Sequence, residues 1–287
     1  MPSLLLLAIA VTAGLAAASL TRLYARRHPG APLAIETARE VGRHGGGPAA
    51  RRVLRAARLD PERATGLALA LAVAAVLVGG MVLAVLAVVV RDTDALAGLD
   101  TSAAEWGDQH ATAFSHEAIT LVTRLGEATA VVVAAVVVAA VEIARTRSRW
   151  VIPFLVVVML GDTLLTEAIK ELVDRARPEI EPVAATLGPS FPSGHTSTAA
   201  ASWAACALVA GRWWGPRSWP ALAGVAVGIA VAVAASRVLL DVHWLSDVIA
   251  GLALGWAWFA ACALAFGGHA LRFGAAAQVA AREASRV

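Results

Sequence analysis

Three short stretches of the sequence carry side chains that could hold a phosphate group and attack it. They read Lys170-x6-Arg177-Pro178, then Pro192-Ser193-Gly194-His195, then Ser236-Arg237-x5-His243-x3-Asp247. Lys170 is the only lysine among the 24 Lys and Arg residues of the chain. Each stretch lies at the end of a hydrophobic segment. Together they offer three cations, a helix start and two histidines, which favours phosphoryl chemistry at a common site.

The first stretch supplies two cations close to a predicted turn. Lys170 and Arg177 would lie about 10 Å apart along a continuous helix. Pro178 disfavours helix at the residue before it, so the chain should turn there. Two cations near one turn can grip a phosphate, and the arginine fork can do so with two hydrogen bonds. Taken alone, Lys170, Arg175 and Arg177 could instead anchor the segment to lipid headgroups.

The second stretch predicts an anion site at a helix start. Ser193 is a suitable N-cap for the apolar segment that follows. Free backbone N–H groups at such a start bind anions, and Gly194 allows a ligand to approach closely. His195 would lie in the first turn, where it could give a proton to a departing oxygen. An ordinary capped helix with an interfacial histidine explains this stretch equally well.

The third stretch predicts a histidine that is oriented by a carboxylate. His243 and Asp247 are four residues apart and would share one face of a helix. The carboxylate can bond one imidazole nitrogen and leave the other free to attack, with Arg237 beside them. His and Asp at this spacing could also bind a metal. No third and fourth ligand stand at a suitable spacing, however, and the nearby cations would repel a metal ion.

The elements that must position these residues are membrane helices. Hydrophobic residues make up 59% of the 287 residues, and about 20 apolar residues suffice to cross a bilayer. Seven segments qualify as candidates: 3–20, 65–90, 128–144, 150–170, 195–211, 219–236 and 245–266. The sequence thus predicts an all-α, multi-pass membrane bundle.

The positive charges indicate the orientation of this bundle. Arginines cluster at 22–63, 145–149, 212–217 and beyond 271, each flanking a membrane segment on what would be the same side. The positive-inside rule places these clusters in the cytoplasm. The loops 92–127, 171–194 and 237–244, which carry the candidate site, then lie outside. Because the net charge of +3 reflects topology, no nucleic-acid partner is expected.

Two further features of the sequence bear on the positioning of the site. Loop 92–127 is long enough for a surface helix, in which Phe114, Ala118, Leu121 and Leu125 would share one face that Ile119 interrupts. Asp162, Thr166 and Lys170 form a stripe along one helical segment. We expect this stripe to face the bundle interior and to support Lys170; a neutral Asp162 bonded to a neighbouring helix is the alternative.

Taken jointly, the three stretches resemble the signature of the type 2 phosphatidic acid phosphatase (PAP2) superfamily, over roughly residues 65–266. The resemblance implies a six-helix core whose site faces away from the cytoplasm and works without a metal or other cofactor. It implies that His243 is a nucleophile forming a phosphohistidine, Asp247 its orienting partner and His195 the acid for the leaving group. The implied phosphate cradle consists of Lys170, Arg177, Ser193, Gly194 and Arg237.

These expectations define three regions and one function. Residues 1–63 are expected to be an N-terminal anchor helix, retained rather than cleaved, and a basic connector; residues 64–268 the phosphatase core; and residues 269–287 a cytoplasmic tail. The expected function is hydrolysis of a lipid phosphate monoester or diphosphate in the cell membrane. Undecaprenyl diphosphate and a phosphatidic acid or phosphatidylglycerophosphate-like lipid are the candidate substrates. A lipid phosphotransferase, a haloperoxidase-like enzyme and a non-catalytic lipid transporter are the alternatives.

Overall fold

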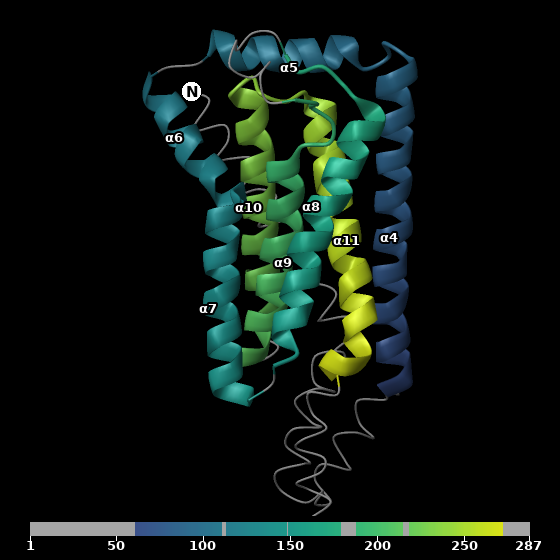
Figure 1. Ribbon diagram of the computed structural model, residues 1–287, viewed down its shortest axis with the longest axis vertical. Helices are drawn as coiled ribbons and strands as arrows, with labels where there is room; N and C mark the ends of the chain where they lie inside the picture. The colour runs from purple at the N-terminus through teal and green to yellow at the C-terminus, as the bar shows by residue number, and fades with distance from the viewer. Residues whose placement is uncertain (1–60, 111–112, 148, 179–187, 215–217, 272–287) are drawn as a thin grey trace, which may run out of the picture.

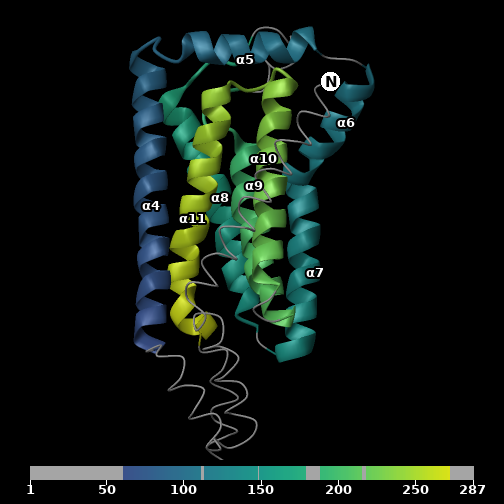
Figure 2. The same ribbon diagram turned by 180° about the vertical axis from the view of Figure 1, so that it is seen from behind.

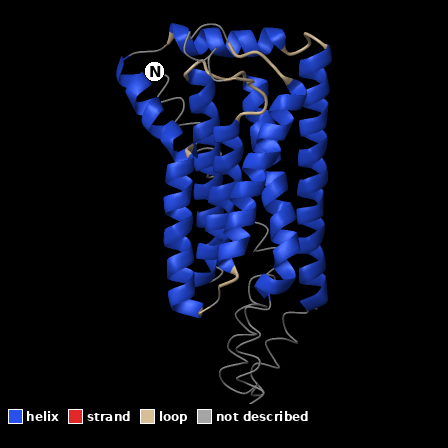
Figure 3. Cartoon of the chain, viewed as in Figure 1, coloured by secondary structure: helices blue, strands red, loops and turns tan. Residues whose placement is uncertain are grey.

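The described part of the chain folds into helices. The computed structural model describes residues 61–110, 113–147, 149–178, 188–214 and 218–271, and no strand occurs within these ranges (Figure 3). The described helices are α4 (Pro61–Asp92), α5 (Ala97–Gln109), α6 (Ala113–Thr123), the 3₁₀ turn η1 (Arg124–Gly126), α7 (Ala128–Thr146), α8 (Val151–Val173), α9 (Gly194–Trp214), α10 (Trp219–Leu239) and α11 (Leu245–Leu271).

Six long helices run side by side, and one short helix lies across their end. Figures 1 and 2 show α4, α7, α8, α9, α10 and α11 as an upright bundle, with α5 lying across its upper end. Helix α9 is central and contacts α7, α8, α10 and α11, whereas α4 packs on the outside against α11. The N-terminal end of α9, which carries the second candidate stretch, lies toward the end of the bundle that α5 crosses.

Five of these helices are long and apolar enough to cross a membrane: Ala72–Asp92, Ala128–Thr146, Val151–Val173, Trp219–Leu239 and Leu245–Phe266. The sixth, α9, carries Ser197, Thr198 and Ser202 among its alanines and is shielded by its neighbours. Its lower hydropathy is consistent with a central position, because a helix surrounded by protein need not be apolar on every face. The prediction of an all-α membrane bundle is confirmed, and the six core segments are found within a few residues of their expected bounds.

Helix α4 presents most of its surface outward. Leu77, Val78 and Met81 are each more than 60% exposed, as expected of side chains that face lipid. On the opposite side Gly79 lies against α11, where an added Cβ would come within 2.8 Å of the carbonyl oxygen of Ala253. Glycine is required at this position because the two helix backbones approach so closely.

Residues 92–127 form two helices and a 3₁₀ turn where the sequence predicted one helix, and the expected stripe does not coincide with the buried face of α6. Ile119, which interrupts the expected pattern, is only 3% exposed, whereas Leu121 is 65% exposed. Helix α6 is rotated so that Ile119 packs against Ala232 of α10. The orientation of such a short helix is set by its neighbours, which its own periodicity does not reveal.

Parts of the expected organisation fall outside the described residues. These are the segment 3–20 proposed as an anchor, the connector up to residue 60 and the tail from residue 272. The expected boundaries at 63 and 269 fall within α4 and α11, which begin at Pro61 and end at Leu271.

Candidate active site

The three candidate stretches meet at the end of the bundle that α5 covers. Arg177, which follows α8, donates from Nη1 to the carbonyl of Val242 in the turn between α10 and α11, at 2.7 Å. The backbone N–H of Ser193 donates to the carbonyl of Asp247 at 3.0 Å. These two hydrogen bonds join the exit of α8 and the start of α9 to the same turn.

His243 lies in this turn and is 2% exposed. Its Nε2 atom lies 3.2 Å from Nη1 of Arg177, and a guanidinium group can only donate. Nε2 must therefore accept with its lone pair, which places the ring proton on Nδ1. This tautomer leaves Nε2 as the nitrogen that could act as a nucleophile.

Asp247 lies on the Nδ1 side of the same ring. Its Oδ2 atom is 3.5 Å from Nδ1 of His243 and also accepts the backbone N–H of Trp244 at 3.0 Å. The distance to Nδ1 is longer than a normal hydrogen bond. Asp247 is completely buried, so its charge acts on the ring with little screening by solvent.

His243 is neutral near neutral pH. Burial lowers the pKa of His243 from 6.5 to about 4. The carboxylate of Asp247 opposes this shift, and the charges of Arg177 and Arg237 add to it. A neutral imidazole with a free Nε2 lone pair is the form required for attack on phosphorus.

His195 faces the same cluster from the first turn of α9. The charges of Arg237, Lys170 and Arg177 and the ring of His243 all act on it electrostatically. Gly126 of η1 packs against it so closely that a Cβ there would lie 2.7 Å from the carbonyl oxygen of His195. The two histidines thus lie in one positively charged site, although they are 48 residues apart in the sequence.

The start of α9 has the features of an anion site. Ser193 is buried immediately before the helix, and its Oγ accepts the hydroxyl of Thr196 at 3.0 Å. Its backbone N–H is already bonded to Asp247, so the donors left for a ligand are the next N–H groups, beginning with Gly194. A Cβ on Gly194 would lie 3.8 Å from Nζ of Lys170, which places this ammonium group beside the helix start.

Lys170 and Arg237 border the site on two sides. Lys170 donates to Glu167 at 2.8 Å, but Glu167 is 59% exposed, so this ion pair holds the lysine only weakly. Arg237 is 8% exposed and donates from Nη1 to the hydroxyl of Thr123 at 3.1 Å. Its Nε atom is buried without a hydrogen-bond partner, so the guanidinium retains donor capacity for an anionic ligand.

The stripe along α8 faces the bundle interior, as expected. Asp162 is completely buried and Thr166 is 2% exposed. Asp162 accepts hydrogen bonds from the hydroxyls of Ser197 and Thr198 in the first turns of α9. Asp162 therefore bonds to a neighbouring helix, as in the alternative interpretation of the sequence. These two hydrogen bonds fix the start of α9 against α8.

Sequence reasoning missed a second set of polar residues behind His243 and Asp247. Arg175 forms ion pairs with Asp247 at 2.6 Å and with Asp100 of α5 at 2.7 Å. Ser246 donates from both its backbone and its hydroxyl to Asp100. In the sequence, Arg175 was considered only as one of three cations that could anchor a membrane segment. No characteristic spacing links Asp100 to the three stretches.

A cavity of about 530 Å³ adjoins this site beneath α5. Arg177 and Trp244 line it from the site, and Thr101, Glu105 and Asp108 line it from α5. A phosphorylated group bound at Arg177 could extend into this space. Among the residues that the structure describes, no group of three His, Cys, Asp or Glu side chains is arranged to hold a metal ion.

Comparisons with known proteins agree with this architecture. The model of the PAP2 superfamily matches residues 150–269, which contain all three stretches. Phosphatidylglycerophosphatase B of Bacillus subtilis is 34% identical over 116 residues, covering 38% of this chain and 55% of the relative. Lipid A 1-phosphatase of Rhizobium johnstonii is 32% identical over 120 residues, covering 38% of this chain and 45% of the relative. The chain therefore aligns with only about half the length of these curated relatives.

A solved structure matches a larger part of the fold. The crystal structure of a transmembrane PAP2-type phosphatidylglycerolphosphate phosphatase from Bacillus subtilis superposes with a TM-score of 0.63 and 25% sequence identity. The superposition covers 68% of this chain and 96% of that protein. The family match over residues 150–269, these relatives and the shared fold together make the chain similar to the PAP2 superfamily.

Proposed function

We propose that the protein is a membrane lipid phosphatase that hydrolyses a lipid phosphate monoester or diphosphate through a phosphohistidine on His243. The observation that carries the proposal is the neutral, buried ring of His243, whose Nε2 lone pair points at Arg177. His195 and the cations Lys170, Arg177 and Arg237 lie around the same point. The relatives named as phosphatidylglycerophosphatase and lipid A phosphatase support the same class of reaction.

In the first step Nε2 of His243 attacks phosphorus as the bond from phosphorus to the lipid oxygen breaks. Arg177, Lys170 and Arg237 stabilise the negative charge on the phosphoryl oxygens. His195 gives its proton to the departing lipid oxygen, and the charge of the bound phosphate favours the protonated form of His195 that this step needs.

In the second step water attacks the phosphohistidine. His195, now neutral, takes a proton from this water as the N–P bond breaks and inorganic phosphate forms. His243 returns to its neutral state with the proton still on Nδ1, where Asp247 stabilises the positive charge that develops during each transfer. No metal is needed in this scheme.

The substrate is expected to be an amphiphile whose phosphate enters beneath α5 while its tail lies between helices. Undecaprenyl diphosphate, phosphatidic acid and phosphatidylglycerophosphate-like lipids all meet this description. The cavity beside Arg177 offers the hydroxyl of Thr101 and the carboxylates of Glu105 and Asp108, which could hydrogen-bond a hydroxylated group attached to the phosphate.

The decisive test is a panel of lipid phosphates offered to pure protein in detergent without added metal. We expect inorganic phosphate to be released from at least one of these lipids, vanadate to inhibit and a chelator to have no effect. A radiolabelled phosphoryl group should remain on the protein in base and be lost in acid, as a phosphohistidine behaves. Transfer of phosphate to an added acceptor lipid would identify a phosphotransferase, and no reaction with any lipid would contradict the proposal.

We also propose that the site faces the outside of the cell, because the arginine clusters lie at the other ends of the segments. Ser102 of α5 is exposed, and both Cys206 and Cys262 are buried. A Ser102→Cys variant should therefore be labelled in intact cells by a membrane-impermeant thiol reagent. Labelling only after the cells are broken would contradict the orientation.

A further inference from the structure

We propose that Arg175 is a positioning residue for the reaction and that the cross helix α5, through Asp100, is part of the same unit. Arg175 would hold the carboxylate of Asp247 in place behind His243, and Asp100 would hold Arg175. The inference rests on the proposed function, since it concerns the orientation of the nucleophile.

Arg175 occupies the space between two buried carboxylates. Its Nη1 donates to Oδ1 of Asp247 at 2.6 Å and its Nη2 donates to Oδ2 of Asp100 at 2.7 Å. Asp247 is completely buried and Asp100 is 2% exposed. The planar fork of arginine can bond two carboxylates at once in a fixed geometry, which lysine cannot reproduce.

Both carboxylate oxygens of Asp100 accept hydrogen bonds. Its Oδ1 accepts the backbone N–H of Ser246 at 2.8 Å, and its Oδ2 accepts the hydroxyl of Ser246 at 2.6 Å in addition to Arg175. Ser246 directly precedes Asp247 at the start of α11. A single side chain of α5 thus holds both the arginine and the backbone next to the catalytic carboxylate.

Two other contacts fix α5 and Arg175 in this place. Gly107 of α5 lies on the end of α10, where an added Cβ would be 3.3 Å from the Cα of Leu239. The guanidinium of Arg175 lies over the ring of Trp244 at 5.5 Å from its centroid. The indole of Trp244 in turn donates to the carbonyl of Ala176 at 2.9 Å. Arg175 is therefore confined by the cross helix and by the turn that carries His243.

The orientation of Asp247 follows from these contacts. Arg175 occupies Oδ1, and the N–H of Trp244 bonds Oδ2 on the side that faces Nδ1 of His243. Without Arg175 the buried carboxylate would lose its charge partner and could rotate toward other donors. Because Arg175 does not line the cavity beside Arg177, its loss should affect the chemical step more than substrate binding.

The test compares kcat and KM of Arg175→Ala, Arg175→Lys, Asp100→Asn and the double variant Arg175→Ala/Asp100→Asn with those of the wild type. Dioctanoyl phosphatidic acid, or whichever panel lipid the wild type hydrolyses, serves as the probe. Exposed residues of the same outer region provide matched controls, namely Arg124→Ala and Asp92→Asn, which should leave both constants unchanged. Each assay is repeated with guanidinium ion added, because a small cation can occupy the space left by the arginine.

We expect kcat of Arg175→Ala to fall about 10- to 100-fold, by analogy with the hydrogen-bond partners that orient histidine ligands in metal sites, whose removal costs about as much, with KM unchanged. Arg175→Lys should recover only part of the loss. The double variant should be no slower than Arg175→Ala alone if the two residues act as one unit. Added guanidinium should raise the rate of Arg175→Ala but not that of the wild type.

Three outcomes would overturn the inference: an unchanged kcat in Arg175→Ala, losses that multiply in the double variant, or a loss that guanidinium does not reverse. If Arg175→Ala does not fold, Arg175→Lys and Asp100→Asn carry the same comparison, and unchanged kcat in both would refute it. Failure of the wild type to release phosphate from any lipid would instead count against the proposed function.

Discussion

At one end of the bundle Asp247 and Asp100 share Arg175, and at the other end Glu142 of α7 pairs with Arg212 of α9 at 2.9 Å. Both clusters contain completely or almost completely buried carboxylates. Glu142 also accepts the indole N–H of Trp213 at 2.8 Å. The two clusters are thus built from the same chemical groups.

Their neighbours differ. The Arg175 cluster lies directly behind the ring of His243, whose Nε2 atom lies 3.2 Å from Nη1 of Arg177 on the side away from Asp247. The Glu142 cluster ends at Thr146, a hydroxyl that bonds within its own helix, and it joins α7 to α9. In our proposal a buried ion pair therefore has a different consequence at each end: orientation of a reacting group at one, attachment of two helices at the other.

The strongest way to break the comparison is to remove the reacting group itself. His243→Ala should lower the rate of phosphate release by about 10⁴-fold or more, the loss typical of a nucleophile that acts within a catalytic unit. The radiolabelled phosphoenzyme should disappear with it. Single-turnover measurements on pure protein would follow both quantities together.

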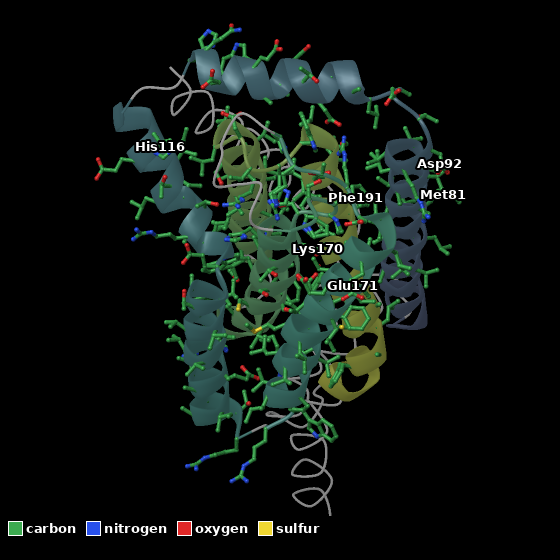
Figure 4. All side chains as sticks on the ribbon, turned by 45° about the horizontal axis from the view of Figure 1, so that its top comes forward. Met81, Asp92, His116, Lys170, Glu171 and Phe191 are labelled. Atoms are coloured by element: carbon green, nitrogen blue, oxygen red, sulfur yellow. The ribbon has the colours of Figure 1, made fainter. Side chains whose placement is uncertain are left out.

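The matched control is His116→Ala on α6, an exposed histidine far from the site. Figure 4 places His116 and Asp92 on opposite sides of the bundle, with Lys170 and Phe191 between them. This variant should keep the wild-type rate. Near-normal phosphate release by His243→Ala would show that another group attacks phosphorus.

The sequence was sufficient to predict the bundle and to name the candidate site residues that the structure brings to one end of it. Long apolar runs and the spacing of Lys170, Arg177, His195, His243 and Asp247 are local properties that a sequence displays directly. The bundle could be predicted because each helix must satisfy its own backbone hydrogen bonds inside a membrane, whatever its neighbours are.

The remainder depends on contacts between distant segments. The pairing of Asp100 with Arg175 spans 75 residues, and neither residue lies at a spacing that marks it. The burial of Ile119 follows from where α6 meets α10. The close packing of Gly126 on His195 likewise appears only once η1 and α9 are placed together.

Breaking the Glu142 cluster should lower the free energy of unfolding and leave kcat unchanged. Glu142→Ala removes the buried carboxylate that pairs with Arg212, and removing one partner of a fully buried pair costs about 3–5 kcal/mol. The lower end of that range is expected here, because Arg212 is 23% exposed and can reach solvent. Thermal unfolding in detergent should show the decrease, while kcat per folded molecule should stay at the wild-type value.

Glu171→Gln on α8 is the control for this comparison, since Glu171 is exposed and lies near the site end. It should change neither stability nor rate. If Glu142→Ala lowered kcat of the folded protein as strongly as Arg175→Ala, the division of roles between the two clusters would be wrong.

A smaller effect is expected from the phosphate cradle. Arg237→Met keeps an unbranched apolar stem in the buried position but removes the charge and the donors of the guanidinium. Loss of one such stabilising group typically lowers kcat by about 10²–10³-fold. Thr123→Val, which removes only the hydroxyl that accepts from Arg237, should cost less. Steady-state kinetics would compare the loss of kcat in the two variants. An equal loss in both would indicate that the position of the Arg237 side chain matters for the reaction, rather than its charge.

The pH dependence of kcat/KM tests the protonation of His243 in the wild-type protein, without any substitution. Since burial lowers the pKa of His243 to about 4, the acid limb of the kcat/KM profile should lie near pH 4. Below that pH, kcat/KM should fall by roughly tenfold per pH unit. An ordinary histidine would give this decline near 6.5. Proton binding to the unfolded chain begins at that higher value, so the free energy of unfolding should decrease as the pH falls from 6.5 to about 4 and level off below.

Asp247→Asn tests whether the pKa of His243 sets the acid limb of the kcat/KM profile. The carboxylate of Asp247 raises the pKa of His243 against the effect of burial, so its neutralisation should move the acid limb of the residual activity to lower pH. Glu142→Gln, which neutralises the buried carboxylate of the other cluster, should leave the limb in place. An acid limb that moved equally in both variants would mean that the pH profile reports the stability of the bundle and not the protonation of His243.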